Sequence, residues 1–343
     1  MEVVLEQSGK GEVPATDGGG AKSAPAVSCG MRDFLKKKDS HFSEKAIEGL
    51  LALAGISSMI IISLIFIFLF KEAVQFFRTS GLLSLIGRWV YDAWDEKEVF
   101  KVMWQAVSVQ PKYSLIPLIC GSFLVSLPAT LMASVLGIGC AIYLSEIASP
   151  KVREVLKPTM ELLGGIPSVV VGFFMLAVMA SFIQDLFQIK FRLNAFIGAL
   201  GVAVCTFPII VTLSEDALRA VPKDLREASY ALGATKWQTI IGVTVPTAIS
   251  GISAAVILGF GRSLGETMIV LMATGNAALV TANIFSSVRT MTANIAAELG
   301  AVAQGSEHYY ALFLVGAVLF TMTFILNIIA EIILNKMRRR LRM

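Results

Sequence analysis

Two oppositely charged residues lie inside a long apolar segment of this sequence. Arg262 and Glu266 are near the middle of residues 247–274, and the residues on either side of them are apolar. A charged side chain at the depth of a lipid bilayer costs at least about 2.5–3.5 kcal/mol. At the spacing i, i+4, both side chains are expected on one face of a helix, roughly 6 Å apart along its axis. Ionisable residues in such a position are candidates for contact with a transported ion.

A structural ion pair is the alternative interpretation of these two residues. Arg before Glu is the less favourable order along a helix, and burial of an ion pair rarely stabilises a protein. We therefore favour the interpretation in which Arg262 faces a pathway and contacts an anion. Together with the neighbouring hydroxyl residues Ser263 and Thr267, the pair makes up the predicted pathway site.

The same segment contains a motif that is catalytic in another setting. Residues 261–265 match G-x-S-x-G, which serves catalysis on a strand-to-helix turn with a histidine nearby. Here the motif lies within an expected helix, and His41 and His308 lie outside every apolar segment. The glycines Gly261 and Gly265 instead favour close helix packing, which is compatible with a pathway role. We therefore predict no catalytic residue in this chain.

The cysteines do not have the spacing of a metal or disulfide site. The four cysteines are Cys29, Cys120, Cys140 and Cys205. Three of them lie in apolar segments, and we interpret them as small buried hydrophobic residues. We predict no metal site and no cofactor bound by this chain.

The composition places these residues in an integral membrane protein. The chain has 343 residues, 55% hydrophobic and 16% charged, whereas about a quarter of the residues of a soluble domain are charged. Six apolar segments are long enough to cross a bilayer as helices, which takes about 20 residues each. They are residues 47–70, 114–145, 161–182, 193–213, 247–274 and 310–334. We therefore predict an all-α membrane protein with six transmembrane helices.

The distribution of basic residues predicts the orientation in the membrane. Six spans put both termini on one side, and the segments on that side contain 19 Lys and Arg, against 9 in the opposite segments. Because cytoplasmic segments are enriched in these residues, both termini are expected in the cytoplasm. The net charge of +4 lies at the membrane edges, so we expect a lipid bilayer and no nucleic acid as a partner.

The domain organisation follows from the same pattern. Residues 1–46 are polar, and we expect a disordered cytoplasmic tail there. Residues 47–112 hold the first transmembrane helix and an aromatic external segment that suits the membrane interface. Residues 113–335 form the main transmembrane domain, and residues 336–343 form a basic cytoplasmic C-terminus.

The segment between the fourth and fifth spans, residues 217–245, is too long for a simple connector. Pro222 can open an amphipathic helix, and Gly233 interrupts it. A second short helix can follow before Pro246 starts the fifth span. The segment could lie on the cytoplasmic leaflet or dock on another cytoplasmic protein, and its pattern alone does not separate these two roles.

The spacing within this segment resembles the cytoplasmic EAA signature of permeases of ABC importers. Residues 227–246 read E-A-S, three residues, G, nine residues and V-T-V-P. The signature reads E-A-A, three residues, G, nine residues and I-x-L-P. Residues 259–276 resemble the permeases of the phosphate-specific importer, in particular the sister permease with Met after Gly-Glu-Thr and then Gly-Asn. The resemblance covers residues 111–334.

The resemblance implies the MetI-like fold of a type I ABC-importer permease, in a bacterial inner membrane. In that family the residues that match Arg262 and Glu266 are associated with phosphate movement, whereas Ser263 stands where Ala is usual. Arg presents a planar fork of donors that suits a phosphate oxyanion. Glu266 could accept a hydrogen bond from a protonated phosphate, or hold Arg262 when the path is empty.

The family also implies the partners of the chain. A short helix in the loop would dock into a cleft of a partner ATPase, and the matching residues are Glu227, Ala228, Gly233 and Pro246. A second homologous permease, a dimer of cytoplasmic ATP-binding subunits and an external phosphate-binding protein complete the expected importer. ATP would bind to the partner ATPase, because this chain contains no G-x-x-x-x-G-K-[ST] motif.

Two other transport functions remain open at this point. The permease could carry an oxyanion other than phosphate. A secondary anion transporter would work without ATP, and such folds often show repeated halves with paired broken helices. No earlier segment repeats residues 262–266, and the long loop would have no role in that case.

Overall fold

The computed structural model describes residues 41–79, 81–92 and 97–341. Within this part of the chain, six helices are long and apolar enough to cross a membrane. They are Ile47–Thr79, Ile116–Ile147, Ser168–Phe187, Ala195–Arg219, Lys236–Gly265 and Glu307–Asn335. Each overlaps one predicted span, so the predicted all-α membrane fold is confirmed. Most of the predicted tail, residues 1–40, lies outside the described residues.

The first membrane helix, α2 (His41–Thr79), is longer than predicted. It begins before residue 47 and continues past residue 70, so residues 41–46 are helical rather than part of a tail. Its apolar side chains from residue 50 to residue 62 are exposed, as in a helix surrounded by lipid chains. The chain divides into two compact units within this helix, after Ser63, and all further elements belong to the second unit.

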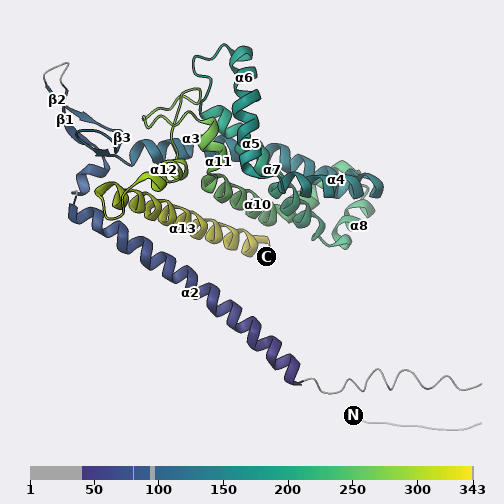
Figure 1. The fold of residues 1–343 in the computed structure, drawn as a ribbon. Coiled ribbons are helices and arrows are strands. Elements are labelled where there is room, and N and C mark those ends of the chain that lie inside the picture. Colours follow the sequence, from purple (N-terminus) through teal and green to yellow (C-terminus); the bar gives the residue numbers. More distant parts are fainter. Residues whose placement is uncertain (1–40, 80, 93–96, 342–343) are drawn as a thin grey trace, which may run out of the picture. The chain divides into compact units, whose positions relative to one another are not determined.

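Three helices form the centre of the second unit (Figure 1). They are α3 (Ile116–Ile142), which continues into the π-helical turn η2 (Tyr143–Ile147), α7 (Ala195–Arg219) and α10 (Val245–Gly265). Small residues such as Ala129 and Ala199 are fully buried in the core they share. A methyl group added at Gly259 of α10 would lie 2.8 Å from the side chain of Ile210 of α7. The helices therefore approach closely, as small residues permit in membrane proteins.

The third predicted span is split by its Gly-Pro segment. α4 (Pro150–Gly164) ends at the glycine pair, and Pro167 precedes α5 (Ser168–Phe174). The π-helical turn η3 (Met175–Met179) and α6 (Ala180–Phe187) continue this helix. The predicted break is confirmed, but the membrane span starts after it and not at residue 161, because the residue before a proline is disfavoured in a helix.

The long loop before the fifth span contains two short helices, as predicted. Pro222 precedes α8 (Lys223–Ala231), Gly233 has a φ of 83°, and α9 (Lys236–Thr239) follows. The span does not start at Pro246, however. α9 continues through the π-helical turn η4 (Ile240–Thr244) into α10 as one membrane helix. Pro246 has no backbone N–H to donate to the preceding turn. The π-helical turn accommodates it, because such a turn leaves a carbonyl group without a helical partner.

The fifth predicted span, residues 247–274, is not a single helix. α10 ends at Gly265, and a separate helix, α11, begins after the two intervening residues Glu266 and Thr267. The remaining elements are α11 (Met268–Ala273), α12 (Met291–Glu298), the 3-10 turn η5 (Leu299–Ala301) and α13 (Glu307–Leu341). Residues 336–341, predicted as part of a separate C-terminal segment, continue α13.

The aromatic segment before α3 folds into a short turn and two hairpins. The elements are η1 (Leu82–Leu85), β1 (Arg88–Asp92) paired antiparallel with β2 (Lys97–Lys101), and β3 (Trp104–Gln105) paired antiparallel with β4 (Lys112–Tyr113). Trp89 is exposed, whereas Trp104 is buried against the ring of Tyr113. The predicted interfacial position therefore suits Trp89, but Trp104 belongs to the core.

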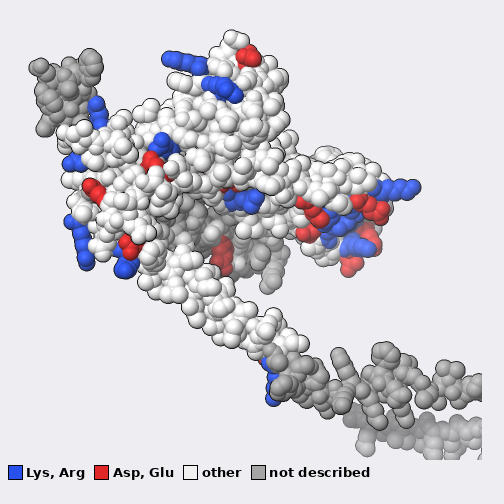
Figure 2. Space-filling view, in the orientation of Figure 1, with Lys and Arg blue, Asp and Glu red and all other residues white. Residues whose placement is uncertain are grey.

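The central helices have two different ends (Figure 1). At the end we call the hairpin end lie β3, β4, α12 and the start of α3. At the α8 end lie η2, α4, α8 and the end of α7. Charged side chains of both signs gather at the α8 end, whereas the middle of the bundle is largely uncharged (Figure 2).

Candidate functional site

The predicted pathway residues lie where the fifth membrane helix breaks. Glu266 follows the last residue of α10 and has extended backbone angles (φ −65°, ψ 134°). Thr267 donates from its hydroxyl to the Gly265 carbonyl (3.2 Å) and from its N–H to Glu266 Oε1 (3.2 Å). The hydroxyl of Thr292 on α12 donates to the Glu266 carbonyl at 2.7 Å. Polar groups of the protein thus support the opened backbone, which a broken membrane helix requires.

This break changes the expected relation between Arg262 and Glu266. Glu266 follows the last residue of α10, so the two residues do not lie within one continuous helix as predicted. Among the described residues, Arg262 has no hydrogen bond or ion pair, and its side chain is exposed. Arg262 and Glu266 do not form an ion pair among the described residues, and the guanidinium group of Arg262 is accessible to an anion.

Ser263 faces the interior of the bundle. It is 3% exposed, and its hydroxyl donates to the Gly259 carbonyl at 3.0 Å. The same oxygen lies 3.2 Å from Thr130 Oγ1 of α3 and 3.1 Å from Thr206 Oγ1 of α7. Ser263 therefore joins three helices in a packing contact, while the other three predicted pathway residues remain accessible at the break.

The two glycines beside Arg262 have different surroundings. Gly265 is exposed, and a Cβ atom there would meet nothing within 4 Å, whereas Gly261 is half-buried and its Cβ atom would lie 3.9 Å from Asn327 of α13. Among the described residues, the predicted helix packing is therefore absent at Gly265 and looser at Gly261 than at Gly259. Leu258, 56% exposed, lies on the same face as Arg262 and Gly265, because residues three and four apart are neighbours on a helix.

An ionic cluster at the hairpin end was not detectable from the sequence pattern. Glu298 of α12 accepts hydrogen bonds from Arg289 Nη1 at 2.7 Å and from Trp104 Nε1 at 2.9 Å. Its other close neighbour is His308 Nε2 of α13, at 2.8 Å. Trp104 and Glu298 are 194 residues apart in the chain. Burial, together with the charges of Glu307 and Glu298, raises the pKa of the adjacent Tyr113 to about 12, which keeps this phenol uncharged.

The segment between Arg289 and Thr292 fixes α12 against α3. The N–H of Met291 donates to Ser122 Oγ at 3.0 Å. The backbone of Arg289 lies so close to Gly121 that a Cβ atom there would collide with the Arg289 carbonyl. Because Thr292 follows directly, these contacts also position the hydroxyl that supports Glu266.

The α8 segment presents an exposed surface. Glu227, Ala228 and Gly233 are all exposed, and Leu232 is 89% exposed. A Cβ atom at Gly233 would meet nothing within 4 Å, so glycine is required here by its positive φ and not by lack of space within the chain. An apolar side chain that no described residue covers suits contact with a protein or a lipid surface.

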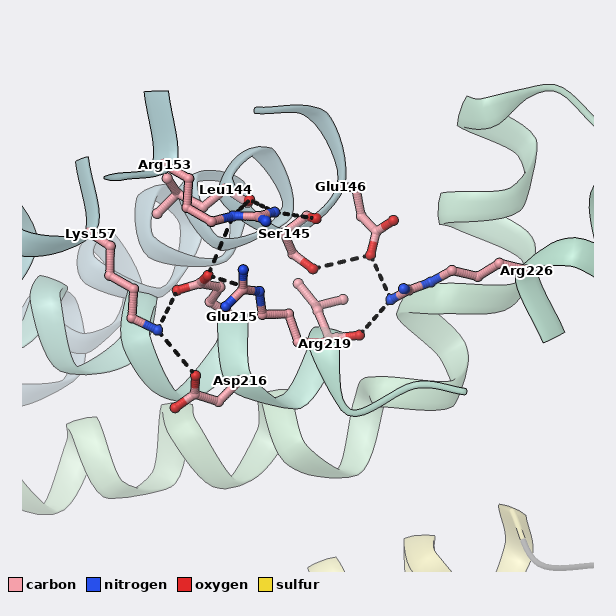
Figure 3. Close-up of polar contacts among 10 residues, drawn as sticks. Leu144, Ser145, Glu146, Arg153, Lys157, Glu215, Asp216, Arg219 and Arg226 are labelled. Atoms are coloured by element: carbon pink, nitrogen blue, oxygen red, sulfur yellow. Dashed lines mark hydrogen bonds and ion pairs between the residues drawn. The ribbon is translucent and has the colours of Figure 1, made fainter. Parts of the chain in front are cut away.

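Acidic and basic residues form a network at the α8 end (Figure 3). Glu215 of α7 is 1% exposed and is surrounded by three cations. They are Lys157 at 3.3 Å, Arg219 at 3.3 Å and Arg153 at 3.9 Å. A second ion pair joins Arg226 of α8 to Glu146 of η2 at 2.9 Å. These contacts join four different elements, so no local pattern in the sequence predicted them.

Comparison with known proteins identifies the family. Residues 133–339 match the family described as the binding-protein-dependent transport system inner membrane component. The chain belongs to this family. YqgH of Bacillus subtilis, a probable ABC transporter permease, is 40% identical over 222 residues, which cover 65% of this chain and 72% of that protein. The phosphate transport system permease PstC of Mesorhizobium japonicum is 30% identical over 275 residues, covering 71% of this chain and 84% of that protein.

Solved structures share the fold of this permease. A chain of the inward-facing methionine ABC transporter MetNI superposes with a TM-score of 0.53 at 17% identity, covering 65% of this chain and 95% of its own length. A chain of a bacterial alginate ABC transporter superposes with a TM-score of 0.54 at 15% identity, covering 87% and 99%. The predicted type I ABC-importer permease fold is therefore confirmed.

Proposed function

We propose that this ABC permease carries inorganic phosphate into the cytoplasm as a subunit of an ATP-driven importer. The observation that carries the proposal is the exposed guanidinium of Arg262, without a partner among the described residues, beside a break in a membrane helix. The similarity to PstC proteins supports phosphate as the anion.

Arg262 and Glu266 have complementary roles in this proposal. A phosphate that leaves water needs a cation in a medium of low dielectric constant, and Arg262 supplies it with a fork of donors. Glu266 accepts a hydrogen bond from protonated phosphate and repels the more highly charged form, so the ion is not trapped. Thr267, at the same break, offers its hydroxyl as a neutral partner.

The open face of α10 with Leu258, Arg262 and Gly265 suits a pathway shared with a second homologous permease. The exposed α8 segment suits docking on one subunit of a dimer of cytoplasmic ATPases, with ATP bound there. An external phosphate-binding protein would deliver the ion at the hairpin end. In this arrangement the α8 end and both termini are cytoplasmic, in the inner membrane of a bacterium.

Reconstitution with partner subunits tests the proposal. The chain, purified from native membrane with the subunits that accompany it, is placed in vesicles with phosphate outside and ATP available to the ATPase. We expect ATP-dependent phosphate uptake, with a nucleotide-binding subunit and a second six-span permease in the purified complex. Uptake without any ATPase subunit would instead indicate a secondary transporter.

A second candidate substrate is another oxyanion. The similarity to YqgH, described as a probable ABC transporter permease without a named substrate, leaves the anion open. Competition in the same vesicles separates the candidates, because phosphate uptake should resist an excess of sulfate. If sulfate enters at the rate of phosphate, the proposed selectivity is wrong.

A further inference from the structure

The helix α8 has few attachments to the rest of the protein. None of its residues is buried. Within the described chain, its side chains form hydrogen bonds to other elements through Ser229 and Arg226. Ser229 bonds to Thr239 of α9, the next helix along the chain, at 2.9 Å. Among the described residues of α8, Arg226 alone forms side-chain hydrogen bonds to η2 and α7, where Glu146 is 80 residues away in sequence and Leu218 is eight.

Arg226 joins the ends of two helices through a single nitrogen atom. Its Nη2 donates to Glu146 Oε1 at 2.9 Å (Figure 3) and to the Leu218 carbonyl at 2.8 Å. Glu146 belongs to η2, the end of α3, and Leu218 lies in the last turn of α7. A basic side chain at the C-terminal end of a helix is favourable, because the last carbonyl groups lack partners within the helix.

The two helix ends that Arg226 contacts are also held to one another. Arg153 of α4 donates to the carbonyl groups of Leu144 and Ser145 in η2, the latter at 2.8 Å. The same arginine faces the buried Glu215 of α7. η2, α4 and the end of α7 therefore form one ionic assembly, and a displacement of Arg226 acts on the whole of it.

The helices α3 and α7 connect this ionic assembly to the pathway site. Near their middle, α3 and α7 carry Thr130 and Thr206, which both bond to Ser263 of α10. Arg262 is the next residue in the chain. A shift of the α3 and α7 ends is thus connected through packed helices to the residue beside the proposed phosphate contact.

We infer that Arg226 is a positioning residue for coupling, which transmits movement of α8 to the ends of α3 and α7. The inference rests on the proposed function, in which α8 docks on an ATPase. Without Arg226, movement of α8 would still reach α10, because α9 continues into α10. The hydrogen bonds from α8 to the ends of α3 and α7 would be lost. ATP hydrolysis would then continue while the pathway helices respond incompletely.

The two hydrogen bonds of Arg226 determine which variants test this role. Both hydrogen bonds of Arg226 come from one nitrogen, so Arg226→Lys, with a single ammonium group and three donors, should keep them. Arg226→Met keeps the length of the apolar stem but removes every donor. Lys151→Met is the matched control, because Lys151 is an exposed cation at the start of α4, outside the segment proposed to dock, with no hydrogen bond or ion pair among the described residues.

The experiment measures phosphate taken up per ATP hydrolysed by the complete importer in vesicles. We expect Arg226→Met to lower this ratio by about 5-fold or more, the lower end of couplings between sites. Arg226→Lys and Lys151→Met should retain the wild-type ratio. Glu146→Gln should lower the ratio less, and the double variant with Arg226→Met should be no worse than Arg226→Met alone, because the two residues act through one contact.

Several results would overturn the inference. They are an unchanged ratio in Arg226→Met, an equal loss in Lys151→Met, or additive losses in the double variant. If Arg226→Met does not co-purify with the ATPase, the Glu146→Gln variant is used to test the inference instead. A wild-type ratio of phosphate taken up to ATP hydrolysed in an assembled Glu146→Gln importer would also overturn the inference. Failure of the proposed function is distinguishable, because the wild-type importer itself would then take up no phosphate.

Discussion

Arg262 lies on the face of α10 that also carries Leu258 and Gly265, and this face is exposed in the described chain. A guanidinium at membrane depth is stable only where water, another chain or an anion solvates it. Because Arg262 has no hydrogen bond or ion pair among the described residues, replacing it should break neither kind of interaction within them. A substitution at Arg262 can therefore change phosphate uptake without changing the free energy of unfolding.

Arg262→Gln should abolish most phosphate uptake in vesicles, whereas Arg262→Lys should recover part of it, since a point charge does not replace a bidentate fork. The melting temperature in detergent should change little. If the residue were half of a structural ion pair with Glu266, removing one partner would cost roughly 3–5 kcal/mol. The double variant Arg262→Gln with Glu266→Gln should not regain uptake, and recovered uptake would contradict the pathway role.

Ser263→Ala is the matched control for that experiment. It removes a buried hydroxyl that bonds to Thr130 and Thr206, at a cost of about 1 kcal/mol in the free energy of unfolding. Because its side chain faces away from the open surface and the packing of α3 and α7 against α10 remains, uptake should be largely retained while the melting temperature falls. The opposite pattern would place Ser263 in the pathway.

At the scale of elements, the break after α10 depends on α12. The Glu266 carbonyl, which the helix end leaves open, receives its hydrogen bond from Thr292. α12 in turn is held against α3 at Gly121 and Ser122. The position of the pathway carboxylate is therefore set by a contact between α3 and the segment before α12.

Gly121→Ala should destabilise the protein by about 1–3 kcal/mol, as overpacking does, because the added methyl group would collide with the Arg289 carbonyl. Uptake should fall as well, since the displaced segment carries Thr292. Gly139→Ala is the control on the same helix, where a Cβ atom meets nothing within 4 Å. The melting temperatures of both variants are measured by thermal unfolding in detergent. Equal melting temperatures for the two variants would argue against the close contact between Gly121 and the Arg289 carbonyl.

The turn after α8 permits a second test at the element scale. Gly233 has a φ of 83°, a conformation that costs most other residues roughly 1–2 kcal/mol. Gly233→Leu should still insert into the membrane but uncouple ATP hydrolysis from uptake, because the turn that presents Leu232 is distorted. Gly233→Asn should be milder, since Asn tolerates this conformation. Wild-type uptake by the Leu variant in an assembled complex would exclude docking through this turn.

At the scale of the whole molecule, the two ends of the bundle differ in kind. The hairpin end carries short strands and the Glu298 cluster, while the α8 end carries the Glu215 network and the exposed α8. The excess of Lys and Arg in the segments joined to the α8 end predicts that this end is cytoplasmic.

Labelling of single cysteines with a membrane-impermeant reagent in intact cells tests that orientation. In a background without the native cysteines, Lys97→Cys in β2 should be labelled and Lys236→Cys at the start of α9 should not. Labelling after the membrane is opened is the control that both sites are reactive. Labelling of position 236 in intact cells, without labelling of position 97, would reverse the orientation.

The sequence by itself determined the features that depend on local composition. Apolar length predicted all six membrane helices, because each span must bury its own backbone in lipid. The turns at Pro222, Pro167 and Gly233 were also predictable, since a fixed φ, a missing N–H or a positive φ is a property of the residue. The ends of the spans were less accurate, because helices here continue beyond the apolar stretch, as α2 does.

Only the tertiary structure decided how these elements place the candidate site. Residues 247–274 have no local signal strong enough to end a helix at Gly265, and the break is supported by Thr292, 26 residues beyond Glu266. The inward position of Ser263 depends on hydroxyl groups of α3 and α7. The network around Glu215 requires three helix ends to meet. Hydrogen-bond partners and close packing join residues that are distant in sequence, and such contacts leave no periodic pattern in the chain itself.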